Sequence, residues 1–160
     1  MNELIAVLML YISIMTGWSI PEPPKIEYVE NDRKMFMLLH ECDKQPDLAI
    51  CKNYDPKTST QVLALYNYHI KTILLYKDFS LSSIKDQSIL LHELVHHMQY
   101  SEKYIYYTML CRGYTEKEAL DIQEAWLLER NLTLEEAIEI GPLYRALLTM
   151  CDIHPSGIYE

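Results

Sequence analysis

One pentapeptide constrains this chain more than any other feature: His92-Glu93-Leu94-Val95-His96, the pattern H-E-x-x-H. Apolar residues recur around it at positions 91, 94, 95 and 98, which is the i, i+3, i+4, i+7 spacing of an amphipathic helix. Ser83, with Asp86 three residues later, resembles a helix cap. We therefore predict a helix over residues 84–100 that carries the pattern in its interior.

The spacing of the two histidines predicts a metal site. Residues four apart lie one above the other on a helix, so His92 and His96 can direct their imidazoles at one zinc ion, at roughly 2.0–2.1 Å. Glu93 projects beside the pair, where its carboxylate can act as general base toward a water molecule that zinc activates. The alternative is a helix whose histidines face solvent or pair with neighbouring acids. His97 lies about 100° round the helix from His96, so it is expected to have no ligand role.

A catalytic zinc needs a third protein ligand, and the next predicted helix carries candidate acids. This helix is expected to begin with Thr115 as its N-cap. Glu118 and Glu124 both share a face with apolar residues, as expected of an acid carried against a core. The residues alone leave the choice open, and Glu118, three positions after Thr115, also fits the role of a helix cap.

The segments HELVHHMQ and EALDIQEAWL resemble an uncharacterised group of bacterial exported zincins, which carry HELVHHxQ and then a Glu-Ala-aromatic-x-x-Gln helix. More broadly they are similar to the gluzincins, metallopeptidases whose third ligand is a Glu on the helix after H-E-x-x-H. The resemblance covers residues 72–132 and places the third ligand at Glu118, in a segment ending at Gln123. The sequence departs from the pattern at Leu120, where the group has an aromatic residue. The resemblance implies a zincin-like fold and cleavage of peptide bonds.

Upstream of the metal helix, residues 61–66 and 71–76 have the composition of two short strands joined by a turn at residues 67–69. By analogy with zincins, Ile73 to Tyr76 would form the edge of the cleft and bind an extended substrate through its backbone. An ordinary hairpin packed on the helix fits these residues equally well.

Further helices are predicted on both sides of this region. One helix is expected from Asn31 to Cys42, followed by a loop to Thr60. Thr133 with Glu136 forms a capping box, and Gly141-Pro142 ends that helix and begins a last one. The expected fold class is therefore α+β: a mainly helical, zincin-like single domain over residues 21–160, with a small β-hairpin before the H-E-x-x-H helix.

The first twenty residues are apolar from Leu4 to Ile14 apart from Tyr11 and Ser13. We interpret residues 1–20 first as an export signal, second as an N-terminal membrane anchor and third as a buried core helix. Glu3 stands where a signal has positive charge, which weighs against the first interpretation.

Four cysteines support export. None forms a C-x-x-C pair, so we expect two disulfides in an oxidising compartment. Three pairings are possible, and the sequential spacing favours Cys42 with Cys51 and Cys111 with Cys151. The protein is then expected to be periplasmic or secreted. Buried reduced thiols in a cytosolic protein are the alternative.

Net charge and motif together define the expected function. A net charge of −9 argues against nucleic acid as a partner, because nucleic-acid binding needs clustered Lys and Arg. We expect a zinc-dependent hydrolase, a small exported metallopeptidase acting on a peptide or protein substrate. The alternatives are a zinc-binding module without catalysis and a disulfide-bonded interaction protein without metal. A tyrosine after the metal helix is a candidate oxyanion donor, and the four candidates are Tyr100, Tyr104, Tyr106 and Tyr107.

Overall fold

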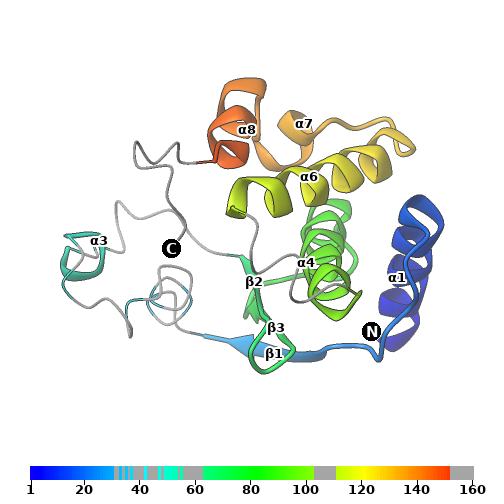
Figure 1. Cartoon of the computed structure of the whole chain (residues 1–160), viewed down its shortest axis with the longest axis horizontal. Helices are drawn as coiled ribbons and strands as arrows, with labels where there is room; N and C mark the ends of the chain where they lie inside the picture. Colours follow the sequence, from blue (N-terminus) through cyan, green and yellow to red (C-terminus); the bar gives the residue numbers. More distant parts are fainter. Residues whose placement is uncertain are drawn as a thin grey trace, which may run out of the picture.

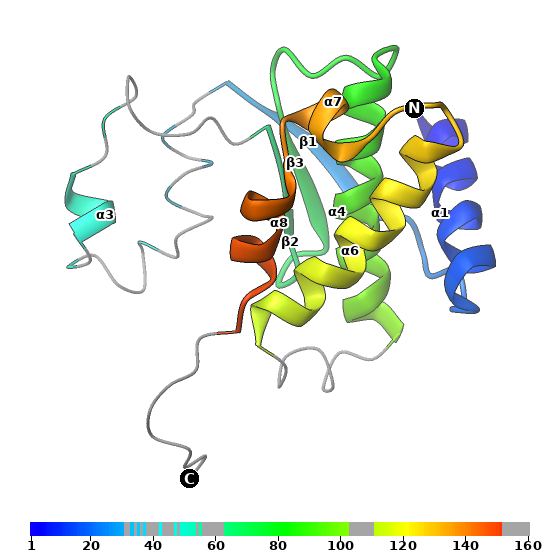
Figure 2. The same cartoon turned by 90° about the horizontal axis from the view of Figure 1, so that it is seen from above.

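The helix predicted over residues 84–100 is confirmed as α4 (Ile84–Glu102), which carries the H-E-x-x-H pattern. It lies at the centre of the fold (Figure 1). It contacts helix α1 (Asn2–Thr16), helix α6 (Arg112–Leu128) and strand β2 (Ala64–Asn67). Figure 2 shows α4 between the sheet and α1, with α6 lying across it. Its core-facing side chains are fully buried, and they are Leu90, Leu91, Leu94, Val95 and Met98.

This computed structural model describes residues 1–30, 63–102 and 111–151, together with scattered positions between 33 and 55. Most of the helix predicted from Asn31 to Cys42 and of the loop to Thr60 therefore lies outside the described residues. Within them the fold class is the expected one, a mainly helical α+β domain with a small sheet.

The sheet has three strands in the order β1-β3-β2. Strands β2 and β3 (Thr72–Tyr76) form the predicted antiparallel hairpin, with Tyr66 opposite Ile73. Strand β1 (Lys25–Val29), which the sequence analysis did not predict, pairs with β3 in parallel. Because β3 is paired on both sides, the expectation that Ile73 to Tyr76 form a free cleft edge is wrong. The edge strand beside α4 is β2.

Helix α6 begins earlier than predicted. Its N-cap is Cys111, and its first turn starts at Arg112, so Thr115 lies inside the helix and is no cap. The Thr115 hydroxyl donates a hydrogen bond to the backbone carbonyl of Arg112 at 2.8 Å, a bond that does not need an exposed helix end. The N-cap of α6 therefore lies four residues before the predicted one.

The two short helices after α6 follow the predicted end signals. Helix α7 (Leu134–Ile138) begins at the capping box of Thr133 and Glu136, with both reciprocal bonds formed. Helix α8 (Pro142–Thr149) has Gly141 as N-cap and a proline in its first turn, where a missing N–H leaves no hydrogen bond unmade. Both helices pack on α6.

Helix α1 packs into the core through one face. Its buried side chains Ile5, Leu8, Met9 and Ile12 join the same cluster as the apolar residues of α4 and α6. The hydroxyl of Tyr11 donates to the carboxylate of Glu129 at 3.2 Å, which ties α1 to the end of α6. Removal of residues 1–20 as a signal stays a prediction. Within the described ranges, no helix combines the length and apolar character that crossing a bilayer requires.

Both predicted disulfides are confirmed. Cys42 pairs with Cys51, which lies in helix α3 (Ala49–Lys52), and Cys111 pairs with Cys151. Two disulfides fit a protein of an oxidising compartment. The second one joins Cys111, the N-cap of α6, to Cys151, two residues after the end of α8.

Candidate metal centre

Helices α4 and α6 bring three donor atoms together. His92 and His96 lie one turn apart on α4, and their Nε2 atoms are 3.1 Å apart. Glu116, in the second turn of α6, places Oε2 3.2 Å from Nε2 of His92 and 3.6 Å from Nε2 of His96. Among the described residues these three form a group able to hold a metal ion.

The separations of these atoms fit one tetrahedral metal ion. Three ligands at roughly 2.0–2.1 Å from zinc, with tetrahedral angles between them, lie about 3.3–3.4 Å from one another. The three measured separations lie between 3.1 and 3.6 Å. Two imidazoles and a carboxylate are also a ligand set found at catalytic zinc sites, which keep a fourth position open.

The third acid is Glu116, and not the expected Glu118. The face of α6 turned toward α4 carries Glu116, Leu120, Gln123 and Leu127, at i, i+4, i+7 and i+11. Glu118 lies on another side of the helix and accepts a hydrogen bond from Nε2 of Gln99 at 2.9 Å. The signal in the sequence that points to Glu116 is this stripe, because Leu120, Gln123 and Leu127 are all buried.

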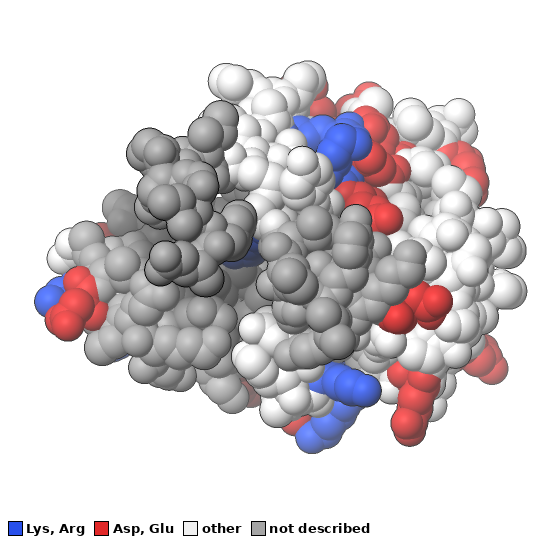
Figure 3. Space-filling view, in the orientation of Figure 1, with Lys and Arg blue, Asp and Glu red and all other residues white. Residues whose placement is uncertain are grey.

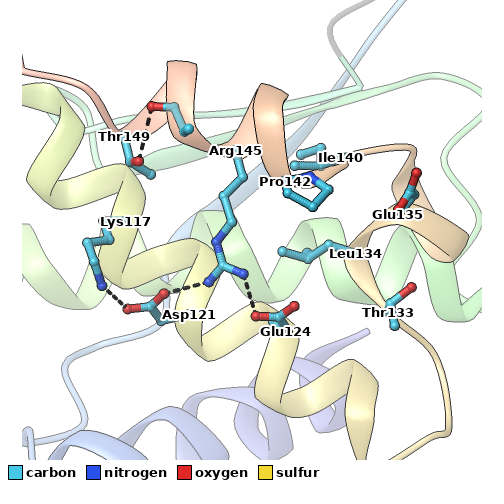
Figure 4. A pocket seen from close by; sticks show the side chains of 11 residues that line it. Lys117, Asp121, Glu124, Thr133, Leu134, Glu135, Ile140, Pro142, Arg145 and Thr149 are labelled. Atoms are coloured by element: carbon cyan, nitrogen blue, oxygen red, sulfur yellow. Dashed lines mark hydrogen bonds and ion pairs between the residues drawn. The ribbon is translucent and has the colours of Figure 1, made fainter.

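Glu124, the other candidate from the sequence, takes part in a different cluster. It forms an ion pair with Arg145 of α8, which also binds Asp121 at 2.6 Å (Figure 4). These residues line a pocket of about 510 Å³ between α6, α7 and α8. The basic side chains Arg145 and Lys117 balance the carboxylates there. On the described part of the face in Figure 3, acidic and basic side chains are likewise interspersed.

The charges of the three donor groups depend on one another. Burial disfavours a charged imidazole, but the Glu116 carboxylate outweighs it and raises the pKa of His96 to about 9. Burial also opposes the charge of Glu116, yet His96 and His92 hold the pKa of this carboxyl far below its usual range. The carboxylate thus stays ionised beside the imidazoles, and the cluster favours a positive charge between its three atoms, whether a proton or a metal ion.

Glu93 lies beside the histidine pair on the side of the sheet. Its Oε2 accepts a hydrogen bond of 2.7 Å from the backbone N–H of Tyr66, and its side chain is 9 % exposed. That N–H belongs to β2, so the edge strand fixes the direction of the carboxylate. Glu93 is also close enough to His96 for its charge to contribute to the raised pKa of that imidazole.

His97 is buried between two partners. Its Nδ1 lies 3.1 Å from the hydroxyl of Tyr66, and its Nε2 lies 2.9 Å from the carbonyl oxygen of Glu22. Burial lowers the pKa of His97, which favours the neutral ring. The residue links the segment after α1 to β2 and takes no part in the metal cluster.

The proposed oxyanion donors are only partly described. Tyr100 stacks on Tyr68 with 4.9 Å between ring centroids. Tyr104, Tyr106 and Tyr107 lie outside the described residues.

A family model described as "Domain of unknown function (DUF6647)" matches residues 1–156. The chain belongs to the DUF6647 family. No curated protein and no solved structure matches this chain significantly. The match includes α1, both helices of the candidate metal centre and both disulfides of this DUF6647 member.

Proposed function

We propose that this protein is a zinc-dependent hydrolase, in which His92, His96 and Glu116 hold the ion and Glu93 is the general base. One observation carries the proposal: two imidazole nitrogens and a carboxylate oxygen, from two helices, converge at separations of 3.1–3.6 Å. Zinc rather than another divalent ion is proposed because imidazole and carboxylate donors in a tetrahedral arrangement suit it.

The residues of the chain divide the chemistry among them. Zinc bound here supplies a Lewis acid that lets a water molecule ionise near neutral pH. Glu93 takes the proton from that water and returns it to the leaving group. The N–H of Tyr66 occupies one carboxylate oxygen of Glu93 and leaves the other to carry the proton. Because Glu93 follows His92 directly in sequence, the base and both histidine ligands are held on one rigid helix.

The proposed substrate is a peptide bond in a peptide or protein. Support for this comes from the resemblance of residues 72–132 to gluzincins, since the geometry of the centre is common to several hydrolytic reactions. The proposed location is the periplasm or the exterior of the cell. The two disulfides support an oxidising compartment, which includes both locations.

The test is a pair of measurements on wild type and Glu93→Gln. Elemental analysis of the purified protein is expected to give close to one zinc per chain in both, because Glu93 is no ligand. Hydrolysis of unfolded casein is expected for wild type and lost in the variant. Lys85→Gln, on the same helix in its first turn, is the control and should keep both properties. Absence of zinc from wild type would overturn the proposal.

A zinc-binding module without catalysis is the second candidate. The observation favouring it is the hydrogen bond that ties Glu93 to the backbone of β2 in a nearly closed position. The same experiment separates the two functions: zinc retained in wild type, with no hydrolysis of any peptide library, would favour the module.

A further inference from the structure

Each histidine of the metal centre has a buried glutamine behind it. Nδ1 of His96 lies 2.8 Å from Oε1 of Gln99, and Nδ1 of His92 lies 3.0 Å from Oε1 of Gln123. Both glutamines are almost fully enclosed, at 0 % and 1 % exposure. A buried amide needs all its polar atoms partnered, so the partners of each glutamine determine which way it points.

The partners of Gln99 fix its orientation. Its Nε2 donates to the backbone carbonyl of Thr115 at 3.1 Å and to the carboxylate of Glu118 at 2.9 Å. A carbonyl oxygen has no hydrogen to give, so the amide nitrogen must lie on this side and Oε1 must face His96. Oε1 only accepts, and Nδ1 of His96 therefore carries the proton. This chain of bonds also gives Glu118 a role, since it holds the glutamine that orients a ligand.

The partners of Gln123 fix the second histidine in the same way. Nε2 of Gln123 donates to the hydroxyl of Ser88 at 3.2 Å. That hydroxyl has one hydrogen, which it donates to the backbone carbonyl of Lys85 at 2.7 Å. Ser88 can then only accept from the glutamine, so Oε1 of Gln123 accepts from Nδ1 of His92.

We infer that Gln99 and Gln123 are positioning residues that keep the Nδ1 proton on both histidines, so that in the neutral rings Nε2 is the nitrogen with the lone pair that can bind a metal. The hydrogen bonds behind His96 end on the backbone carbonyl of Thr115, and those behind His92 end on the carbonyl of Lys85. On the other side of the two rings, the Nε2 atoms lie 3.1 Å apart, beside Glu116. Two lone pairs and a carboxylate oxygen at such separations repel one another unless a cation lies between them. The centre is thus arranged for a metal in advance. The inference rests on the proposed function, and it adds the two residues that prepare the ligands.

The first test measures zinc affinity by competition with a chelator. Gln99→Leu and Gln123→Leu remove the acceptor while keeping a buried apolar shape, and each is expected to weaken zinc binding about 10–100-fold. Gln123→Glu restores an acceptor oxygen and should recover most of the affinity. The matched control is Gln87→Leu. Gln87 is on α4, like Gln99, but its side chain donates to the carbonyl of Leu81, so its loss should leave zinc affinity unchanged.

The second test reads the tautomers directly and needs no metal. Long-range ¹⁵N–¹H NMR of the metal-free protein, recorded over a pH titration up to the alkaline range where both rings are neutral, should show Nδ1–H on both neutral rings. Rings protonated at Nε2 would overturn the inference, as would leucine variants that bind zinc like wild type. If wild type binds no zinc while both rings show Nδ1–H, the proposed function fails and the tautomer assignment stands.

Discussion

Glu116 and Glu118 are two residues apart on α6, and only Glu116 meets the histidines. Glu116→Gln removes one of three proposed ligands. We expect it to weaken zinc binding by more than the about 10–100-fold that loss of a ligand's hydrogen-bonding partner costs. Glu118→Gln removes only the charge of the group that holds Gln99, so we expect it to weaken zinc binding by no more than about 10–100-fold. Chelator competition measures both, and equal losses would contradict the assignment of Glu116.

At this scale the sequence was sufficient to bring His92, His96 and Glu93 together, and insufficient to identify Glu116 as the acid beside them. His92, Glu93 and His96 are fixed relative to one another by a single helix, so their spacing determines their geometry. Glu116 comes from a second helix, and which acid meets the histidines depends on how α6 packs against α4. The sequence alone leaves that packing open, because several acids of α6 share a face with apolar residues.

At the scale of elements, α6 and α8 approach so closely at one point that only glycine fits. A Cβ added to Gly113 would lie 2.5 Å from the backbone oxygen of Thr149 and 2.7 Å from that of Met150. Gly113→Ala must push the end of α8 away, and we expect it to lower the free energy of unfolding by about 1–3 kcal/mol.

Denaturant unfolding measures that loss. Gly141→Ser is the matched control, because its Cβ would come no closer than 3.4 Å, to the flexible side chain of Glu135. Serine also suits an N-cap position, so stability should not fall. Equal stability of the two variants would mean that α8 does not press on α6 as described.

The disulfide Cys111–Cys151 holds the same junction covalently. Replacing both cysteines by serine opens a connection across 40 residues and is expected to cost about 2–4 kcal/mol of stability. It also frees the N-terminus of α6, so zinc affinity should fall as well, because Glu116 lies in the second turn of that helix. The measurements are denaturant unfolding and chelator competition.

The other disulfide provides the comparison. Cys42 and Cys51 are separated by nine residues and lie outside both helices of the metal centre. Their replacement by serine should lower stability without changing zinc affinity. A loss of affinity in this variant, with none in the Cys111/Cys151 variant, would contradict the proposed role of the junction.

Elements with local end signals could be predicted, and those defined by distant contacts could not. The capping box at Thr133 and the proline at 142 act within a few residues, so α7 and α8 start where the sequence places them. Strand β1 exists because residues 25–29 pair with β3 more than forty positions later in the chain. Ile26, Tyr28 and Val29 favour a strand, but five residues do not show which strand they pair with. The pairing with β3 makes β3 a central strand instead of an edge strand.

At the scale of the whole molecule, the first helix is apolar on every side, which is why its sequence resembles an export signal. In the fold one face carries Ile5, Leu8, Met9 and Ile12 into the core, while Val7, Leu10 and Ile14 stay exposed. Fully burying a large apolar side chain stabilises by roughly 1.5–3 kcal/mol. Four such residues contribute about as much as the roughly 5–15 kcal/mol that separates a folded domain from its unfolded chain.

Removing α1 should therefore unfold the domain. We expect the chain of residues 21–160 to lack the cooperative unfolding transition of residues 1–160, measured by circular dichroism in denaturant. A matched pair of substitutions in the full chain tests the cause: Leu8, at 1 % exposure, and Leu10, at 50 %. Leu8→Ala should lower stability by about 2–5 kcal/mol, and Leu10→Ala by less than about 0.5 kcal/mol. If the shortened chain folds and binds zinc with full affinity, α1 is dispensable for the fold and free to serve as a removable export signal.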